Sequence, residues 1–301
     1  MFTDRQLALK SLHYRRRVLQ AIKHAGAGHT GGSLSCLDIL NVLYNRVLRV
    51  APATFADPSR DRYVQSKGHS VEALFVVLAD CGFFPDAELD TLCQYRSHFV
   101  GHPTRKVPGV EQNTGALGHG LPICTGMALG GEMDAAPFRV FTLLGDGELA
   151  EGSNWEAAMA AAHYRLDNLT AIVDCNTLQI TGRTRDVMSN EPLAEKFAAF
   201  GWAARTVDGH DFAELTAALS APLEAGKPSA IIARTVKGRG VSFMEDVGKW
   251  HHGVPNDDEY ARAHAELDAQ IEKVERVDPN ALQGSRAPAS ALGSTRFTSK
   301  P

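Results

Sequence analysis

The sequence lacks the features that mark secreted, membrane-spanning or nucleic-acid-binding proteins. Its five cysteines have neither the paired spacing of a metal site nor that of a disulfide framework. It has no secretion signal and no apolar run long enough to cross a bilayer. The formal net charge is only −4, so the chain has no electrostatic footprint for nucleic acid or an anionic membrane. We therefore expect a cytoplasmic protein with reduced thiols.

What is present is an alternation of helical and extended patterns over most of the chain. This alternation predicts an α/β fold class, with a doubly wound and mostly parallel sheet flanked by helices. We expect one α/β domain over residues 1–277, followed by a flexible tail rich in Pro, Ala and Ser over 278–301. Predicted strands lie at 61–65, 138–144, 169–173, 203–207 and 230–234, and predicted helices lie at about 4–24, 35–48, 71–79, from 212, and 256–274.

Two patterns within helical segments have an ordinary structural interpretation. The basic run Arg15-Arg16-Arg17 lies in the first predicted helix, where we expect a solvated face and not a binding patch. A later group of residues recurs at i, i+3, i+4 and i+7, which predicts the buried face of a helix. Its members are Trp155, Ala158, Met159 and Ala162.

The most informative motif is Gly145-Asp146-Gly147, together with Asn176 further along the chain. Asp146 follows one predicted strand directly, and Asn176 follows the next. In open α/β sheets, ligands bind beyond the carboxyl ends of the strands, so the two side chains are expected to converge on one crevice. A carboxylate and an amide oxygen suit a hard cation such as Mg2+, which keeps positions open for phosphate oxygens. The glycines allow the backbone to approach a diphosphate closely.

Histidine recurs in four segments where the chain should leave the sheet. We predict that these histidines, His29, His69, His102 and His251, form a catalytic set. Imidazoles donate and accept hydrogen bonds near neutral pH, as sugar hydroxyls and migrating protons require. No pair has the i, i+4 spacing of a zinc site, so metal binding is the weaker interpretation. Because His252 adjoins His251, the sequence leaves open which of the two is the fourth member.

The Gly-Asp-Gly and Asn pair resembles the thiamine diphosphate fingerprint. The four histidine segments and the glycine-rich loop 115–120 occur around it in the order found in transketolase. The resemblance covers roughly Asp4 to Asp258 and is to the amino-terminal, diphosphate-binding domain of that family. It implies thiamine diphosphate as cofactor with Mg2+, for which Ca2+ or Mn2+ can substitute. The implied metal ligands are Asp146, Asn176 and the carbonyl of Leu178, and the implied cofactor contacts are His69, Gly115, Leu117, Gly147 and Asn176.

The resemblance also implies roles for residues outside the fingerprint. His29, His69 and His102 would line the substrate channel, and His251 would be the fourth histidine. Glu151 resembles the carboxylate that couples paired active sites across the subunit interface of that family. His119 stands where glutamine is usual, and we assign it no role.

The implied reaction moves a two-carbon ketol unit from a ketose, expected to be phosphorylated, to an aldose, with the cofactor as electron sink. The α subunit of a 2-oxo acid dehydrogenase shares the metal fingerprint but has no need of four histidines. Deoxyxylulose phosphate synthase is normally one long chain. A non-catalytic scaffold subunit is disfavoured because Asp146, Asn176 and all four histidine segments are intact. The sugar stays open among pentose phosphates, apulose phosphate and sulfosugars.

A partner is expected because part of the family's machinery has no counterpart here. Beyond the last predicted strand, near Arg234, the sequence has a loop, a polar helix and the tail. The family also requires a pyrimidine-binding domain, an α/β unit of about 100–150 residues. We therefore expect a second polypeptide carrying the pyrimidine-binding and C-terminal domains, most simply as two copies of each chain. The surface of this chain that faces the second polypeptide is expected to be apolar around the crevice.

Overall fold

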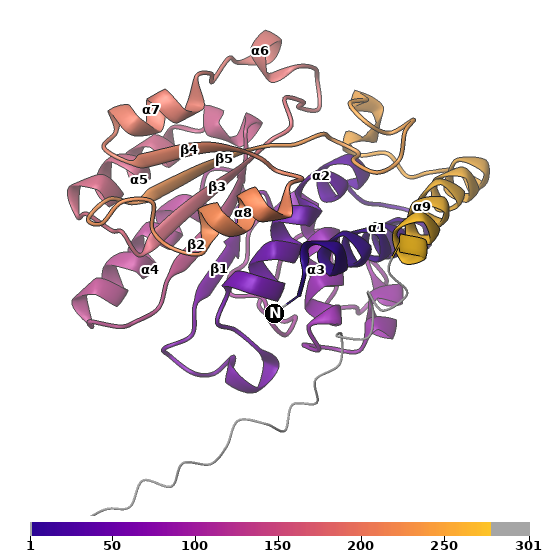
Figure 1. Ribbon diagram of the computed structural model, residues 1–301, viewed down its shortest axis with the longest axis horizontal. Helices are drawn as coiled ribbons and strands as arrows, with labels where there is room; N and C mark the ends of the chain where they lie inside the picture. Colours follow the sequence, from indigo (N-terminus) through magenta and orange to yellow (C-terminus); the bar gives the residue numbers. More distant parts are fainter. Residues whose placement is uncertain (1, 278–301) are drawn as a thin grey trace, which may run out of the picture.

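The computed structural model describes residues 2–277 and shows a parallel sheet between two layers of helices (Figure 1). The spatial strand order is β1-β2-β3-β5-β4, and every pair is parallel. This arrangement confirms the predicted doubly wound α/β fold. The strands are β1 (Arg62–Gln65), β2 (Val140–Gly145), β3 (Leu169–Cys175), β4 (Ala203–Asp208) and β5 (Ser229–Arg234). The helices are α1 (Asp4–Ala25), α2 (Thr30–Val42), α3 (Val71–Asp80), α4 (Gly120–Met133), α5 (Gly152–His163), α6 (Thr184–Val187), α7 (Leu193–Ala199), α8 (Phe212–Leu219) and α9 (Asp257–Val277).

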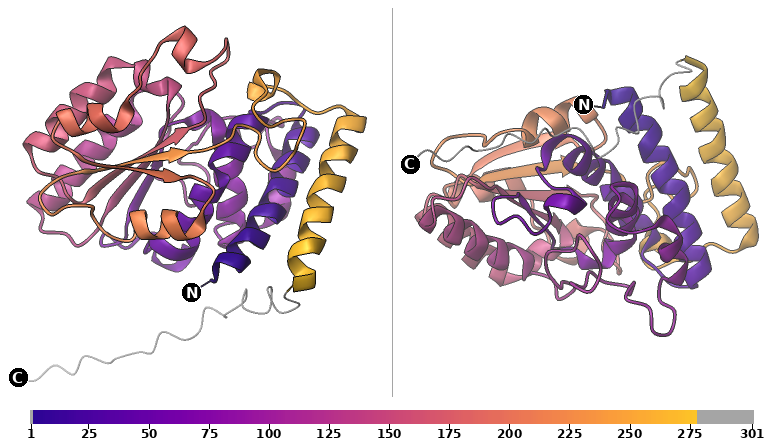
Figure 2. Two further views of the ribbon diagram at one scale, coloured as in Figure 1. Left: turned by 45° about the horizontal axis from the view of Figure 1, so that its top comes forward. Right: turned by 90° about the horizontal axis from the view of Figure 1, so that it is seen from below.

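Alternate side chains of the strands enter two separate hydrophobic cores, one on each face of the sheet. In β2, Phe141 and Leu143 pack in the core formed with α1, α2, α3 and α8. Val140 and Leu144 of the same strand pack in the core formed with α4, α5 and α7. Burial on both faces explains why the strands are continuous apolar runs in the sequence. Helix α9 packs along α1 at the side of the molecule (Figure 2), and the predicted tail 278–301 lies outside the described residues.

The sheet register brings the ends of β2 and β3 level with each other. Gly145 of β2 pairs with Asp174 of β3. Asp146 and Asn176 follow just after these paired residues, so both leave the sheet at the same edge. Between Asp80 and Gly120 the chain has no α-helix or strand, only a short 3-10 segment at Asp86–Thr91, as the composition of this region predicted.

The start of α2 differs from its predicted position. The expected helix began near Ser35, but α2 begins at Thr30, inside the glycine-rich segment. A Cβ on Gly31 would lie 2.9 Å from the carbonyl oxygen of Trp250, and one on Gly32 would lie 2.9 Å from Ser70 Oγ. These glycines therefore permit close packing of a helix and do not form a loop. Beyond Val42 the helix widens into a π-helical turn over Leu43–Val47.

The buried face of α5 also differs from the prediction. Met159 was expected in the core but is 58% exposed, whereas Asn154, Ala157, Ala158 and Ala161 are buried. Small alanines let α5 lie close against the sheet and against α4, so the long methionine side chain is left on the outer side. Helix α4 was not predicted, because its glycines and short apolar runs are not typical of an amphipathic helix.

The basic run on α1 is not a solvated face, contrary to the prediction. Arg15 is buried and forms an ion pair with the buried Asp38 of α2, with Nη1 and Nη2 at 3.0 and 2.7 Å from the two carboxylate oxygens. Arg17 reaches Asp86 across the helix surface, with Nε 2.9 Å from a carboxylate oxygen. Only Arg16 is substantially exposed, where it pairs with Asp268 at 3.0 Å. The run therefore fastens α1 to its neighbours.

Replacing Arg15 should cost far more stability than replacing Arg16. Arg15→Met leaves the Asp38 carboxylate buried without its bidentate partner, which should lower the free energy of unfolding by about 3–5 kcal/mol. Arg16→Met removes a surface pair and should change it by less than about 1 kcal/mol. Urea unfolding of both variants beside the parent chain measures the difference. Equal, small losses would contradict the buried ion pair.

Candidate active site

A cavity of about 380 Å³ lies at the carboxyl ends of β2 and β3. Nine of the ten predicted site residues line it: His29, His69, His251, Gly115, Leu117, Asp146, Gly147, Asn176 and Leu178. His102 is outside the lining but adjoins it, since a Cβ on Gly115 would lie 2.6 Å from His102 Cδ2. Segments from distant parts of the chain thus meet at one edge of the sheet.

The predicted metal ligands offer oxygen atoms to this cavity. Asp146 is buried, and its carboxylate accepts hydrogen bonds only from the backbone N–H groups of Gly147 (2.9 Å) and Thr177 (2.6 Å) within the described chain. Burial, and then the charge of Asp174, raises the pKa of Asp146 to about 6. A cation beside Asp146 would offset both effects, so the donor set suits a hard divalent ion.

The amide of Asn176 is oriented by its neighbours. Its Nδ2 donates to Asp174 Oδ2 (3.2 Å) and to Ser35 Oγ (3.3 Å). These contacts assign the other amide atom as oxygen, and Oδ1 accepts from the backbone N–H of Leu178 at 3.1 Å. The amide oxygen therefore has a fixed orientation and can offer its second lone pair to a cation.

A buried ion pair lies beneath these oxygens. Lys67, at the end of β1, and Asp174, at the end of β3, are fully buried and paired. Burial alone would raise the pKa of Asp174, but the Lys67 ammonium and hydrogen bonds from Ser35 and Thr235 hold it below its usual range. The pair joins the edge strand β1 to the central strand β3 at the base of the cavity, whose lining includes Lys67.

A second lysine of the cavity has no carboxylate paired with it within the described residues. Lys237 is buried, and within residues 2–277 no acidic side chain lies within ion-pair distance of it. Its Nζ lies 2.8 Å from the carbonyl oxygen of Leu178 and 2.7 Å from His251 Nδ1. Burial, and then Lys67, lowers the pKa of Lys237 to about 8. An anion in the cavity would stabilise this ammonium.

One buried polar atom of the same wall also lacks a partner within the described residues. Gln179 lines the cavity, and its buried Oε1 has no hydrogen-bond partner in the described part of the chain. A Cβ on Gly147 would lie 2.7 Å from Gln179 Cγ, so a larger residue there would displace the Gln179 side chain. The cavity therefore offers an ammonium at Lys237 and a carboxylate at Asp146. These two groups fit an anionic ligand that binds Lys237 and carries a cation bound to Asp146.

The histidines gather at one end of the cavity. The ring centroid of His29 lies 5.2 Å from that of His69, 5.7 Å from His251, 6.2 Å from His102 and 4.6 Å from His252. The rings of His69 and His251 are stacked at 5.5 Å. Between the two candidates for the fourth position, His251 lines the cavity, whereas His252 is exposed at its outer side.

Their surroundings keep these imidazoles neutral. Burial, and then the charges of His252 and His102, lowers the pKa of His29 to about 4. Burial, and then Lys237, lowers the pKa of His251 to about 3, and burial with Lys67 holds the pKa of His69 well below its usual range. At pH 7 each of the three rings therefore presents one N–H donor and one acceptor nitrogen.

Several residues of the site could not be recognised in the sequence. Lys67, Lys237, Asp174 and Gln179 lie in or beneath the cavity, yet a lysine in a loop is usually a surface residue. Asp174 did give a signal, because it is a charge at the end of an apolar strand. His119 is exposed at the start of α4, with Nδ1 3.0 Å from the Leu117 carbonyl oxygen, and Glu151 is exposed where α5 begins.

Two other classes of site are not found within residues 2–277. No group of three or more His, Cys, Asp or Glu side chains in this range is placed to hold a metal ion. A cation at Asp146 would therefore depend on amide, carbonyl and non-protein oxygens. No helix in the same range is sufficiently long and apolar to traverse a membrane.

Comparison with known proteins assigns a family to this arrangement. Residues 9–280 match the family model described as transketolase, thiamine diphosphate binding domain. Over 271 residues the chain is 46% identical to an apulose-4-phosphate transketolase subunit from Phocaeicola vulgatus, covering 90% of this chain and 96% of that protein. It is 41% identical over 258 residues to the 6-deoxy-6-sulfo-D-fructose transketolase subunit SqwG of Clostridium sp., covering 85% and 94%.

Larger relatives match along only part of their length. Human transketolase is 38% identical over 298 residues, which span 98% of this chain but 47% of the human protein. The crystal structure of transketolase from Campylobacter jejuni superposes with a TM-score of 0.80 at 27% identity, covering 95% of this chain and 48% of that one. The chain therefore belongs to the transketolase family, in which it corresponds to the thiamine diphosphate-binding domain.

Proposed function

We propose that this chain is the N-terminal subunit of a two-chain transketolase that moves a two-carbon ketol unit from a ketose to an aldose. The observation that carries the proposal is the single cavity in which the Asp146 and Asn176 oxygens, the Lys237 ammonium and a set of neutral histidines meet. Two relatives similar along nearly their whole length are named as transketolase subunits. The bound thiamine diphosphate would supply the electron sink for breaking the carbon–carbon bond.

The metal would be held by the Asp146 carboxylate, the Asn176 amide oxygen and the Leu178 carbonyl oxygen. These three oxygens suit Mg2+, which keeps further positions for phosphate oxygens, and Ca2+ or Mn2+ would substitute. Leu178 already presents its carbonyl to the Lys237 ammonium at 2.8 Å, so cation and ammonium would flank the same anion. Gly147, Gly115, Leu117, Asn176 and His69 would contact the cofactor itself, with Lys237 and Gln179 on its anionic end.

The histidines would act on the substrate. As a neutral ring, His29 can accept a proton or hydrogen bond from a sugar hydroxyl and donate another. His251 accepts from the Lys237 ammonium at Nδ1, so its Nε2–H can donate to a substrate oxygen. The ring of His69 lies 5.2 Å from that of His29 and 5.5 Å from that of His251, and the ring of His102 lies 6.2 Å from that of His29. A 2-oxo acid substrate has no row of hydroxyls for such a set, which disfavours the dehydrogenase alternative.

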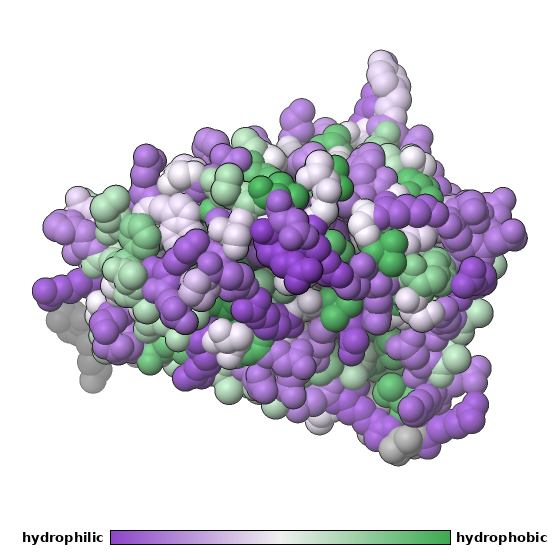
Figure 3. Space-filling view, turned by 90° about the horizontal axis from the view of Figure 1, so that it is seen from above, coloured by the Kyte–Doolittle hydropathy of each residue, from purple (hydrophilic) through white to green (hydrophobic). Residues whose placement is uncertain are grey.

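A second polypeptide would complete the site. We propose that it carries the pyrimidine-binding and C-terminal domains and that the assembly contains two copies of each chain. Exposed apolar side chains near the cavity support a docking surface there: Ile180 is 73% exposed, and Met188 is 58% exposed. The face shown in Figure 3 is mostly hydrophilic, with small separate apolar patches.

The proposed substrate class and location rest on the names of relatives and on the state of the cysteines. Names of relatives include an apulose phosphate and a sulfonated fructose, so we propose a phosphorylated or sulfonated ketose as donor. All five cysteines are free thiols, which supports a reducing compartment such as the cytoplasm.

Removing the Asp146 carboxylate should abolish tight cofactor binding without harming the fold. Loss of a residue that only hydrogen-bonds to a metal ligand already lowers metal affinity by about 10- to 100-fold. Asp146→Ala removes a ligand itself, so it should weaken thiamine diphosphate affinity with Mg2+ by at least about 100-fold. Calorimetry on the assembled enzyme measures this affinity.

Without metal at pH 7, Asp146→Ala should not lower Tm, because the buried carboxylate has a raised pKa and its ionised form costs stability. Asp186→Ala, on exposed α6, is the control; unchanged affinity in Asp146→Ala would refute the metal assignment.

Alanine at His29 or His69 should affect the reaction more than cofactor binding. Each substitution removes a positioned donor and acceptor and should lower kcat/KM by about 100-fold or more. Thiamine diphosphate affinity should fall much less, and the exposed His98→Ala should behave as the parent enzyme. Steady-state kinetics with a ketose donor, beside calorimetry, separates the two effects. A large loss of affinity with kcat unchanged would instead assign the histidines to the cofactor.

The purified chain should not catalyse ketol transfer by itself. With thiamine diphosphate and Mg2+ it should show no turnover, and activity should appear on adding a second polypeptide that contains the pyrimidine-binding domain. A coupled assay during titration of the second chain measures this. Full turnover by the single chain would refute the two-chain proposal.

A further inference from the structure

Lys237 lies on an irregular segment, residues 235–239, that follows β5. The segment is held by backbone contacts from different parts of the molecule: Thr235 N–H donates to the Cys175 carbonyl at 3.2 Å, and Gly238 N–H donates to the Gly31 carbonyl at 3.0 Å. Between them, the N–H of Val236 has a side-chain acceptor, His210 Nε2 at 2.9 Å. The position of Lys237 therefore depends on contacts made outside the cavity, since His210 does not line it.

The hydrogen bonds of His210 define its tautomer. Nε2 accepts from Val236, so the ring proton of the neutral imidazole is on Nδ1. Nδ1 lies 2.7 Å from Asp38 Oδ2 and donates to it. Both ring nitrogens are thus in use, one on the segment that carries Lys237 and one on a buried carboxylate of α2.

Asp38 connects this contact to a second one on the same segment. Arg15 binds Asp38 through Nη1 and Nη2, and its Nε donates to the carbonyl of Arg239 at 2.8 Å. Burial alone would raise the pKa of Asp38, but Arg15 and then His210 hold it well below its usual range. Arg15, Asp38 and His210, which we term the clamp, therefore hold the segment at Val236 and at Arg239, on both sides of Lys237.

The clamp has a consequence for the cavity. A buried ammonium without a carboxylate partner gains solvation if its backbone moves outward, so it keeps its place only where the backbone is restrained. The Lys237 ammonium nevertheless lies 2.8 Å from the Leu178 carbonyl oxygen. We propose that His210 is a positioning residue that acts through the Val236 amide to hold Lys237 against the anionic end of the cofactor. The contact of Lys237 with the cofactor rests on the proposed function.

Two substitutions separate the two hydrogen bonds of His210. His210→Gln can place an amide oxygen where Nε2 accepts from Val236, whereas His210→Asn can replace only the Nδ1 donor to Asp38. Hydrogen exchange of the peptide covering residues 235–240 should stay slow in the Gln variant and quicken about tenfold in the Asn variant, the worth of one hydrogen bond. Labelling of Lys237 by acetic anhydride should increase in the Asn variant alone. Peptides from β2 are the internal control, and His163→Ala, an exposed histidine, is the matched variant.

Cofactor binding supplies the functional readout. In the assembled enzyme, His210→Asn should weaken thiamine diphosphate affinity by about tenfold, with kcat at saturating cofactor within about twofold, and His210→Gln should remain near the parent value. His210→Phe, which keeps the ring volume and removes both bonds, should match the Asn variant and replaces it if that variant does not fold. Equal behaviour of the Gln and Asn variants, changed or unchanged, would overturn the positioning role. If the parent enzyme binds no thiamine diphosphate, the proposed function fails, while exchange and labelling still decide whether His210 holds the segment.

Discussion

The buried carboxylate of Asp174 is the group around which the site is assembled. It accepts hydrogen bonds from Lys67, from Ser35 Oγ at 2.6 Å, from Asn176 Nδ2 at 3.2 Å and from the hydroxyl of Thr235. These partners come from the end of β1, from α2, from the end of β3 and from the segment after β5. Two charges in such a place are costly to desolvate, so the network is a weak source of stability but a strong determinant of geometry. It orients the Asn176 amide and sets the start of the segment that carries Lys237.

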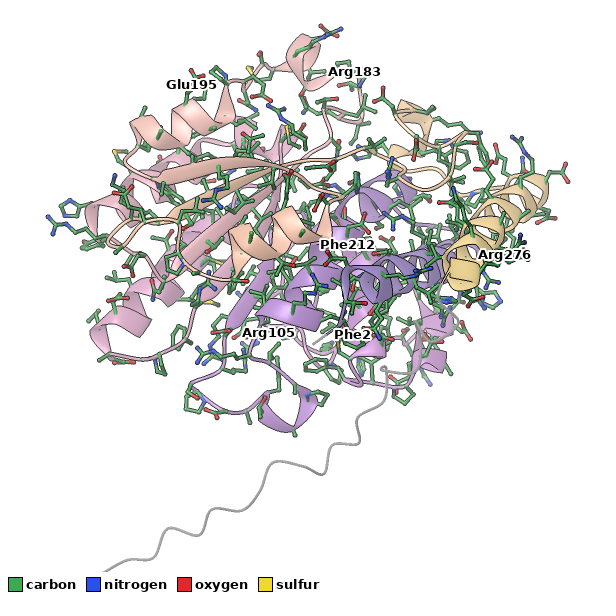
Figure 4. The ribbon with its side chains drawn as sticks, in the orientation of Figure 1. Phe2, Arg105, Arg183, Glu195, Phe212 and Arg276 are labelled. Carbon is green, nitrogen blue, oxygen red and sulfur yellow. The ribbon has the colours of Figure 1, made fainter. Side chains whose placement is uncertain are left out.

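Charge is divided within the cavity in a way that suits two different ligands. One end has a carboxylate of raised pKa and an ammonium that pairs with no carboxylate in the part of the chain the structure describes, which together fit a cation bound to an anion. The other end has neutral imidazoles, which fit hydroxyl groups. Outside the cavity lining, Arg183 is paired with Asp246 at 2.6 Å and also donates to Thr177 Oγ1 at 3.1 Å. Arg183 lies beside α6, at the top of the molecule in Figure 4.

The sequence was sufficient to predict what depends on strand order and local spacing. Asp146 and Asn176 could be placed together because parallel strands end at one edge. The histidines were grouped by the resemblance to transketolase, because only His69 directly follows a strand, whereas His29 lies between α1 and α2. The ion pairs of Arg15 and Lys67 could not be predicted, because their partners are 23 and 107 residues away in the sequence. A charged side chain carries no local sign of a distant counterion. Met159 was placed wrongly because periodicity alone does not show which side of a small-residue helix packs closely.

The central claim, that this cavity holds the metal and diphosphate of the cofactor, can be tested most directly by anomalous diffraction. Crystals of the two-chain assembly grown with thiamine diphosphate and Mn2+ should show one manganese peak per copy of this chain at the cavity. That peak should lie at coordination distance, about 2.1 Å, from the Asp146 carboxylate, the Asn176 amide oxygen and the Leu178 carbonyl oxygen. Manganese and diphosphate bound elsewhere, with this cavity filled only by water, would contradict the account.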